Sequence, residues 1–439
     1  MDYVGSRQFL SNYLVRRNRN QSKSTVDERY SFFKNSSTTA TETGTVNLND
    51  TTVFHCIKKS TGYIFKPIPT IGYNFTIKIS KKDRTPAIVK KRVRKILKSP
   101  VTPSLEKCEG NTTVKYLVFL CKGLCGGWGD RQKGLVFAYV LSRLLHRCFK
   151  IVMPQPCSLS KFYQPNKVQW EPDNETLDPP TKNNTMNAFS HRFQDRMAVL
   201  DLSALYNQTV VYFRAYKDLY ERLVENPHFA EQIGKWTGIR DIQDRFFWSW
   251  NQLMKPSASF LSKVENVIGR DFLIRKGVDV DVLKHERLKP PLCDVGKSPL
   301  ICAHVRIGKN PSVPKDDVFT TIKLADIPVL FEFMSFKDTS GDALFFVATD
   351  YINVRIQAYN YFKGRVIDFG AKIVHIDRLT RDNDRCGGFE DALVDQFLLS
   401  VCDVLVLCRS GFSQMAFYMR NSTDPVYIFE HGAVSLYEE

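Results

Sequence analysis

Residues 395–419 read DQFLLS-VCDVLVLC-RSGFS-QMAFYM, and this stretch decides the fold. Its pattern predicts a helix that ends near Ser400, a buried strand over 404–407, a tight turn, and a second helix. The strand is short, apolar and partly β-branched, as the central strands of parallel sheets are. In the turn, Ser413 is expected to cap the helix that follows.

The turn at 410–413 also has the features of a phosphate site. A helix N-terminus offers free backbone N–H groups and the positive end of the helix dipole, and the hydroxyls of Ser410 and Ser413 lie beside it. The alternative is an ordinary strand–helix turn in which a serine only caps the helix. This stretch alone leaves both interpretations open.

The chain has 439 residues, enough for two or three domains, and its 43% of hydrophobic residues is typical of a packed globular protein. The net charge is +16, but residues 1–110 hold 21 Lys/Arg against 8 Asp/Glu, so +13 lies there and +3 in the remaining 329 residues. The body of the protein is therefore not basic, and no nucleic-acid partner is expected.

Nine Asn-x-Ser/Thr sequons and eleven cysteines indicate a lumen of the secretory pathway. Cys402 and Cys408 lie in the strand pattern and are expected to be buried thiols. No apolar run near the N-terminus is long enough for a signal peptide or membrane anchor. We expect an anchor that is missing from this chain; the alternative is that the sequons are accidental. The sequons are at Asn20, Asn35, Asn49, Asn74, Asn111, Asn174, Asn183, Asn207 and Asn421.

Hydrophobic periodicity predicts two regions in which strands and helices alternate. The first is a β-loop-α-β unit, with strands at 114–121 and 149–153 and a helix at 133–147. The second has strands at 300–305, 343–350, 365–368 and 404–407, with helices at 329–336, 352–362 and 389–400. Between the two regions, residues 155–200 are predicted as loops and residues 213–290 as mostly helical.

This alternation predicts an α/β, GT-B-like protein: two Rossmann-like domains with a cleft between them, the plan of a two-lobed nucleotide-sugar transferase. We expect a basic, stem-like and partly disordered segment over 1–110. An N-terminal Rossmann-like domain with a helical insert, on the acceptor side, is expected over 111–295. A C-terminal Rossmann-like domain is expected over 296–439. Within the first segment, residues 87–98 predict a basic amphipathic helix.

A glycine-rich turn follows the first strand and reads Gly127-Trp-Gly129-Asp130-Arg131. Glycines let the backbone approach a diphosphate or a sugar, and the next helix directs its N-terminus there. The full spaced dinucleotide fingerprint is absent, so an ordinary turn is the alternative.

The strand at 300–305 ends in His304-Val-Arg306-Ile-Gly-Lys309. An arginine at this end of a strand is well placed to bind a diphosphate with two parallel hydrogen bonds. The strand at 343–350 ends in Asp350, whose carboxylate could accept hydrogen bonds from a ribose or a base. The alternatives are a structural ion pair for Arg306 and a helix cap for Asp350.

Taken together, these motifs resemble the fucosyltransferase superfamily, which uses GDP-fucose. The elements that carry the resemblance are His-Val-Arg-x-Gly at 304–308, and Asp-x-x-Leu-Leu-Ser-x-x-Asp at 395–403 followed by the serine-rich turn. The Gly127–Arg131 turn is similar to the Gly-x-Gly-Asn-Arg element of the α1,2 and plant cell-wall branch, with Asp130 where asparagine is usual. The resemblance covers residues 114–153 and 298–420.

The resemblance implies an inverting, metal-independent transferase with GDP-fucose as donor substrate and no cofactor. Arg306 would bind the β-phosphate and stabilise the leaving GDP, and His304 and Asp395 would lie near the guanosine. The diphosphate would rest on the turn formed by Ser410, Gly411, Phe412 and Ser413. Asp316 and Asp317 are the candidates for the general base, with helix capping as their alternative role.

The acceptor would be a glycan or a glycoprotein, and the Gly-Trp-Gly-Asp-Arg element favours an α1,2-type transfer to a glycan hydroxyl. An α1,6-type transfer and transfer to a Ser or Thr of a protein are alternatives. The resemblance also implies a Golgi enzyme of type II topology, with membrane contact only through the missing anchor.

Two other functions compete with this one. The first is a metal-dependent transferase with a single Rossmann-like domain, because Asp279-Val-Asp281 and Asp382-Asn-Asp384 match its Asp-x-Asp signature. The second is an inactive relative that binds glycans or polyanions through the basic front segment. Loss of Arg306 or of the Ser410 turn would support it, and both are present.

Overall fold

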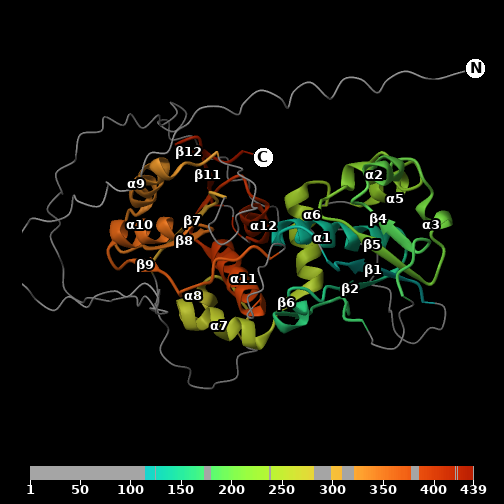
Figure 1. Cartoon of the computed structure of the whole chain (residues 1–439), viewed down its shortest axis with the longest axis horizontal. Helices are drawn as coiled ribbons and strands as arrows, with labels where there is room; N and C mark the ends of the chain where they lie inside the picture. The colour runs from blue at the N-terminus through green and yellow to red at the C-terminus, as the bar shows by residue number, and fades with distance from the viewer. Residues whose placement is uncertain are drawn as a thin grey trace, which may run out of the picture. The chain divides into compact units, whose positions relative to one another are not determined.

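The computed structural model describes residues 114–123, 125–172, 179–236, 239–280, 298–308, 321–376, 385–420, 422 and 424–438. All of them belong to one compact unit of the chain, Thr52–Glu439. They form two sheets of parallel or mainly parallel strands, with helices between the strands, and one short antiparallel pair (Figure 1). The prediction of an α/β protein with two parallel sheets is confirmed, and the alternative with a single Rossmann-like domain is wrong.

The first sheet has the strand order β2-β1-β5-β4, and its strands all run parallel. The predicted β-loop-α-β unit is confirmed as β1 (Tyr116–Leu120), α1 (Trp128–Leu144) and β2 (Cys148–Val152). β4 (Thr185–Asn187) lies in a segment predicted as loop. β5 (Val210–Arg214) begins before the segment predicted as helical, and its Val-Val-Tyr-Phe run is the composition that strands favour.

Helix α1 begins at Trp128, five residues before the predicted start at Lys133. Gly129, Asp130 and Arg131 therefore lie in the first helical turn and not in a loop. Glycine is a poor helix former, by about 1 kcal/mol relative to alanine, which is why the sequence favours a turn here. Tertiary packing overrides that preference, because α1 meets another helix at Gly129 with no room for a side chain.

The second sheet has the order β12-β11-β10-β7-β8-β9. The chain starts at β7 in the middle, adds β8 and β9 on one side, then returns to add β10 and β11 on the other. These strands are parallel, and β12 pairs antiparallel with β11. The strands are β7 (Leu300–Val305), β8 (Leu344–Thr349), β9 (Val366–Ile367), β10 (Val404–Leu407), β11 (Val426–Glu430) and β12 (Ala433–Leu436).

The order of the second sheet reverses between β7 and β10. The connections that leave the carboxyl ends of these two neighbouring strands run in opposite directions, which opens a crevice at that edge. The helices predicted for this region are confirmed as α9 (Ile327–Lys337), α10 (Ile352–Phe362), α11 (Arg385–Val401) and α12 (Gly411–Met419).

The remaining elements lie in the segments that connect the strands of the two sheets. They include the antiparallel pair of β3 (Tyr163–Pro165) with β6 (Met254–Pro256). The helices are α2 (His191–Met197), α3 (Leu202–Leu205), α4 (Tyr220–Val224), α5 (Ala230–Lys235), α6 (Ile242–Leu253), α7 (Ala258–Ile268) and α8 (Arg270–Arg275), with short 3-10 turns at Leu159–Lys161 and Leu324–Asp326. In the ranges that the structure describes, no helix is both long and apolar enough to cross a membrane.

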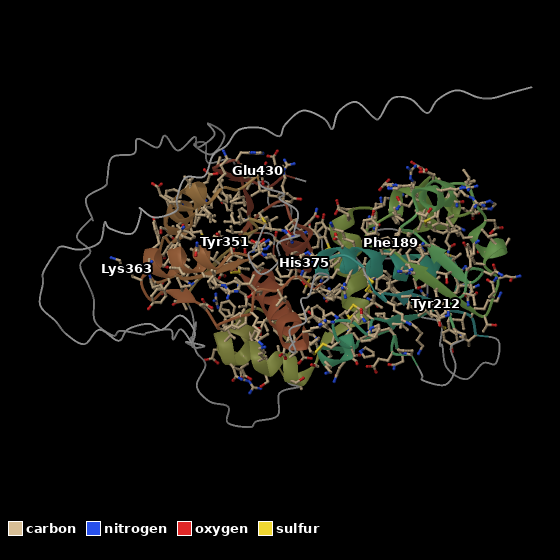
Figure 2. All side chains as sticks on the ribbon, in the orientation of Figure 1. Phe189, Tyr212, Tyr351, Lys363, His375 and Glu430 are labelled. Carbon is tan, nitrogen blue, oxygen red and sulfur yellow. A yellow bond between two sulfur atoms is a disulfide. The ribbon has the colours of Figure 1, made fainter. Side chains whose placement is uncertain are left out.

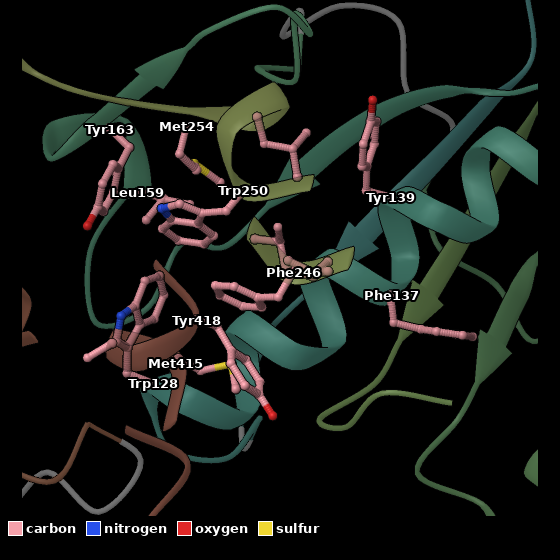
Figure 3. Packing of buried hydrophobic residues seen from close by; sticks show 14 of the residues in the cluster. Trp128, Phe137, Tyr139, Leu159, Tyr163, Phe246, Trp250, Met254, Met415 and Tyr418 are labelled. Atoms are coloured by element: carbon pink, nitrogen blue, oxygen red, sulfur yellow. The ribbon is translucent and has the colours of Figure 1, made fainter. Parts of the chain in front are cut away.

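An aromatic cluster connects the two sheets through one continuous hydrophobic core (Figure 3). Trp250 of α6 stacks on Phe246 at 5.7 Å between ring centroids and meets Trp128 of α1 edge-on at 6.1 Å. Phe246 in turn contacts Tyr418 of α12 at 5.7 Å. Each buried aromatic side chain removes a large apolar area from water, so α1, α6 and α12 are held together where the two sheets approach.

Disulfides reinforce this arrangement. Cys157, which follows β2, is bonded to Cys386 at the start of α11, and Cys302 of β7 is bonded to Cys402. Cys121 and Cys125 are bonded across the loop after β1. The prediction that Cys402 is a buried thiol is therefore wrong, because its neighbour on the adjacent strand is a cysteine. Cys408 is a buried free thiol, as predicted.

The predicted domain boundaries, 110/111 and 295/296, both fall outside the described residues and stay predictions. The same holds for the helix predicted at 87–98. The end of the segment predicted as helical, 281–290, also lies outside them.

Candidate functional site

A cavity of about 150 Å³ lies at the carboxyl ends of β7, β8 and β10, where the order of the second sheet reverses. The first turn of α1 closes it from the side of the first sheet. Its lining therefore combines residues that are up to 285 positions apart in the sequence, from Gly127 to Phe412. The predicted site residues that line it are Gly127, Gly129, Asp130, His304, Arg306, Asp350, Asp395, Ser410, Gly411 and Phe412.

A larger hollow of about 610 Å³ lies elsewhere, beside the first turn of α7 and the start of α11. Serines and one lysine, Lys161, make up most of its polar lining, and none of the predicted site residues is part of it. It does not lie at the carboxyl edge of either parallel sheet. We therefore take the smaller cavity as the functional site.

Two helix N-termini meet in the wall of this cavity. Gly129 in the first turn of α1 lies against the backbone of Gly411 and Phe412 in the first turn of α12. A Cβ atom on Gly129 would come within 2.5 Å of the Gly411 carbonyl oxygen and 2.7 Å of the Phe412 nitrogen. The positive ends of both helix dipoles thus lie beside one cavity, which favours a negatively charged ligand.

Ser410, and not Ser413, caps α12. The Ser410 hydroxyl accepts a hydrogen bond from the Phe412 N–H at 3.3 Å. Ser413 is fully buried and its hydroxyl donates to the carbonyl oxygens of Cys408 and Ser410. The prediction that Ser413 is the cap is wrong because the backbone becomes helical at Gly411, three residues earlier than such a cap requires. The structure does not bring Ser413 to the cavity.

Asp350 holds the loop that carries Arg306. Its two carboxylate oxygens accept hydrogen bonds from the N–H groups of Ile307 and Gly308, each at 2.8 Å. The alternative of a helix cap is wrong, since the N-cap of α10 is Tyr351 and no side chain caps that helix. Gly308 has a φ of 71°, which favours glycine and allows the loop to turn after Arg306. Asp350 thereby sets the position of Arg306 at the cavity.

His304 is an uncharged part of the wall. Burial, together with the charge of Arg306, lowers its pKa to about 3, so the ring is neutral at physiological pH. Its Nδ1 lies 3.2 Å from the Sγ of Cys408, and its ring packs on Phe412 at 5.1 Å. Burial raises the pKa of the Cys408 thiol to about 12, so the thiol stays protonated. Positive charge at the cavity therefore comes from other residues.

Asp395 presents a buried acceptor. Its side chain is 13% exposed, and its Oδ1 accepts no hydrogen bond from any described residue. Burial raises its pKa to about 7, although the Arg355 guanidinium, 4.0 Å from the other oxygen, acts in the opposite direction. Buried polar atoms normally have a partner. A ligand with N–H donors would supply one.

Several cavity residues are not evident from the sequence: Thr349, Arg355, Lys372 and His375, together with Trp128 and the apolar residues Ile373, Val374 and Ile376. His375 is labelled in Figure 2 and belongs to the segment between β9 and α11. This segment has no strand or helix pattern. Asp391 of α11 fixes it by accepting the Lys372 N–H at 2.9 Å, a contact that no local sequence signal indicates. Arg355 donates to the carbonyl oxygen of Ala371 and so supports the same segment.

Two motif residues have structural roles. Arg131 is 1% exposed and does not line the cavity; its guanidinium donates to the carbonyl oxygens of Gly126 and Gln155. Asp403 accepts the Leu300 N–H at 2.8 Å and pairs with Lys276 at 2.6 Å. It therefore fixes the start of β7 relative to α8.

Other candidates lie outside the described residues, namely Lys309, Asp316, Asp317, Asp281, Asp382 and Asp384. Asp279 is described, and it pairs with Lys255 at 3.1 Å. No group of three or more His, Cys, Asp or Glu side chains that could hold a metal ion occurs in the part of the chain that the structure describes.

Neither a scan against models of protein families nor a search of curated proteins found a match. Among solved structures, the chain is similar to a variant of FUT1 from Arabidopsis thaliana in complex with GDP, with 12% identity, a TM-score of 0.45, and coverage of 74% of this chain and 73% of that one. It is also similar to the NodZ α1,6-fucosyltransferase soaked with GDP-fucose, with 12% identity, a TM-score of 0.42, and coverage of 74% and 99%; a further structure of NodZ is described as being from Bradyrhizobium. POFUT1 in complex with GDP-fucose is similar with 13% identity, a TM-score of 0.35, and coverage of 73% and 99%.

Proposed function

We propose that this chain is an inverting glycosyltransferase that moves L-fucose from GDP-fucose to a glycan hydroxyl without a metal ion. The observation that carries the proposal is the cavity at the reversal point of the second sheet, where Arg306 meets the first turns of α1 and α12. Ligands of open α/β sheets bind at the carboxyl ends of the strands at such a point. The motif resemblance to fucosyltransferases adds the identity of the donor.

The diphosphate would bind at the end of the cavity formed by the two helix turns. The backbone N–H of Gly411, the hydroxyl of Ser410 and the guanidinium of Arg306 are suited to phosphate oxygens. Lys372 adds a further cation to the lining. These groups supply the positive charge that a metal ion supplies in other transferases.

The nucleoside would bind near Asp395 and the segment at 372–376. Guanine offers a ring N–H and an adjacent amino group on one edge, and a single carboxylate can accept from both. Uracil has one N–H donor with no adjacent amino group, so a carboxylate discriminates between the two bases. The unpartnered Oδ1 of Asp395 therefore favours a guanine nucleotide.

In the reaction, the acceptor oxygen would form a bond to the anomeric carbon of fucose. The bond from that carbon to the β-phosphate oxygen breaks, and GDP leaves with the electron pair, which inverts the anomeric configuration. Arg306 and the helix N–H groups would stabilise the charge that develops on GDP. The proton of the acceptor would pass to a general base, for which Asp316 and Asp317 stay the candidates.

The proposed acceptor, linkage and cellular location are inferred from the sequence motifs. We place the acceptor among glycans, with an α1,2-type linkage favoured over an α1,6-type linkage or a protein Ser/Thr, and the enzyme in the Golgi lumen. Two described sequons support a luminal protein, because Asn183 and Asn207 are both exposed. Oligosaccharyltransferase needs such accessible sites.

The test is ligand binding followed by thermal shift, in the presence of EDTA, with GDP, GDP-fucose, UDP and UDP-galactose. We expect stabilisation by the two guanine nucleotides alone and its loss in Arg306→Ala. Arg409→Ala is the matched control, since Arg409 is 66% exposed, pairs with Glu430 and does not line the cavity. Release of fucose from GDP-fucose should likewise occur with the wild type and Arg409→Ala and be lost in Arg306→Ala.

Other outcomes would replace the proposal. Stabilisation by uridine nucleotides would refute GDP-fucose as the donor, and stabilisation only after Mn²⁺ is added would refute the metal-independent mechanism. No response to any nucleotide would support the glycan- or polyanion-binding protein. Binding of GDP without any release of fucose would support an inactive relative.

A further inference from the structure

One buried amide, that of Gln396, contacts both helix turns at the cavity. Its carbonyl oxygen accepts from the Trp128 indole N–H at 2.7 Å and from the Gln132 amide at 3.0 Å. Its amino group donates to the Gln132 carbonyl oxygen at 2.8 Å and to the Phe412 backbone oxygen at 3.0 Å. The amide thus uses both acceptor positions and both donor positions.

The partners of Gln396 come from different parts of the chain. Trp128 and Gln132 belong to α1, beside the first sheet, and Phe412 belongs to the first turn of α12, beside the second. Gln396 itself is in α11 and is 1% exposed. Consecutive residues of a helix point about 100° apart, so Asp395 can face the cavity while Gln396 faces the contact between α1 and α12.

The geometry of this contact is sensitive to small shifts. Gly129 and Gly411 already touch through their backbones, and the turn around Phe412 lines the cavity. Hydrogen bonds fix a distance and a direction, whereas the hydrophobic effect that drives the surrounding packing is not directional. In a buried site, the loss of one such amide also leaves several polar groups unsatisfied.

We propose that Gln396 is a positioning residue that aligns the first turns of α1 and α12 so that their N–H groups converge on one diphosphate. That the ligand is a diphosphate depends on the function proposed above. The alignment of the two helix turns by Gln396 does not depend on it. Gln396 contacts no substrate and acts through Phe412 and Trp128. The reciprocal amide pair with Gln132 fixes the angle between the two helices.

The test compares Gln396→Met with Asn226→Leu. Methionine keeps the length of the side chain and removes the four hydrogen bonds. Asn226 is an equally buried amide that donates to the carbonyl oxygens of Met197 and Leu200, remote from the cavity lining. Both variants are expected to lower the Tm, so the control separates a general loss of stability from a loss of alignment.

The first readout is amide hydrogen exchange in the ligand-free protein. We expect exchange in the first turns of α1 and α12 to be at least about tenfold faster in Gln396→Met than in Asn226→Leu, because the turns open locally when their directional contacts are lost. Unchanged exchange in both turns would overturn the inference, whatever the Tm. Gln132→Met, which spares the bonds to Trp128 and Phe412, should give a smaller increase.

The second readout is the Kd for GDP, measured well below the Tm of each variant. We expect Gln396→Met to weaken binding about tenfold and Asn226→Leu to leave it within twofold of the wild type. If Gln396→Met binds GDP as the wild type does, alignment by Gln396 is refuted. If the wild type itself does not bind GDP but the exchange result holds, the proposed function fails and the positioning role stands.

Discussion

Gly129 and Gly411 touch backbone to backbone, so that the first turns of two helices share one wall of the cavity. A Cβ atom at position 129 would lie 2.5 Å from the Gly411 carbonyl oxygen. Neither partner can move aside as a flexible side chain would, since the contact is with main-chain atoms. This contact explains why a glycine stands at position 129, in the first turn of α1.

Gly129→Ala should therefore separate the two turns. We expect a loss of stability of about 1–3 kcal/mol, typical of overpacking, and weaker binding of GDP. Thermal denaturation with and without GDP measures both effects.

Gly127→Ala is the matched control for stability. Its backbone has a φ of −62°, and a Cβ there would meet no atom within 4 Å. It should unfold within about 1 kcal/mol of the wild type, as expected for alanine at an N-cap in place of glycine. Equal destabilisation by both substitutions would contradict the importance of the Gly129–Gly411 contact.

Asp350 should control the affinity for the donor through the loop that carries Arg306. In Asp350→Ala the N–H groups of Ile307 and Gly308 lose their acceptor. We expect a loss of stability of about 1–3 kcal/mol and an increase in the Kd for GDP, because Arg306 is no longer held at the cavity. Calorimetric titration and thermal denaturation measure the two quantities.

Asp338 offers a comparison at the opposite end of β8. It accepts hydrogen bonds from the N–H groups of Gly341 and Ala343, and it pairs with Arg365. Asp338→Ala should lower the stability to a similar extent but leave the Kd for GDP unchanged, because it lies at the edge of the sheet away from the cavity. A parallel rise in Kd in both variants would show that lost stability alone weakens binding.

The pKa of Asp395 predicts how stability depends on pH. Its folded value, about 7, lies above the ordinary value of 3.8, so the folded protein binds more protons than the unfolded protein between these values. The free energy of unfolding contributed by this group therefore falls as the pH rises from about 4 to about 7 and stays low above that. Asp395→Asn should match the wild type near pH 4 and be more stable at pH 8, as measured by Tm in the absence of nucleotide.

Binding of GDP should show the opposite trend. If the Asp395 carboxylate accepts from guanine, binding requires its charged form, and the affinity should be about tenfold lower at pH 6 than at pH 8. Asp395→Asn reports any remaining titration of the phosphate groups. Arg355→Gln removes the charge that lowers the pKa of Asp395, so the midpoint should move to higher pH. If the midpoint of the pH dependence of GDP binding is the same in the wild type and in both variants, Asp395 does not bind the nucleotide.

The positions of the site residues were accessible from the sequence where they follow a strand. His304, Arg306 and Asp350 come after apolar runs, and carboxyl ends of parallel strands share one edge of a sheet. That these three residues line one cavity follows from this rule. The identity of the serine that caps α12 could not be predicted in the same way. Ser410 and Ser413 both fit a cap, and the choice depends on where the chain leaves β10.

Residues fixed by distant contacts could not be predicted in this way. The segment at 372–376 takes its place from Asp391 and from the packing of Val374 on Gly388. Neither contact leaves a periodic pattern in the segment itself. The early start of α1 has a similar cause, since the contact with Gly411 comes from a residue 282 positions away in the numbering.

The packing of α7 and α8 determines where the chain can be cut to make chimeras. These helices precede the second sheet in the sequence, yet Phe260 packs on Phe397 of α11, and Lys263 pairs with Glu390. Lys276 likewise neutralises Asp403 at the start of β10. A chimera that keeps the second sheet of this chain should therefore place its junction before Ala258. A junction near residue 298 would instead separate the second sheet from α7 and α8, the helices that pack on it.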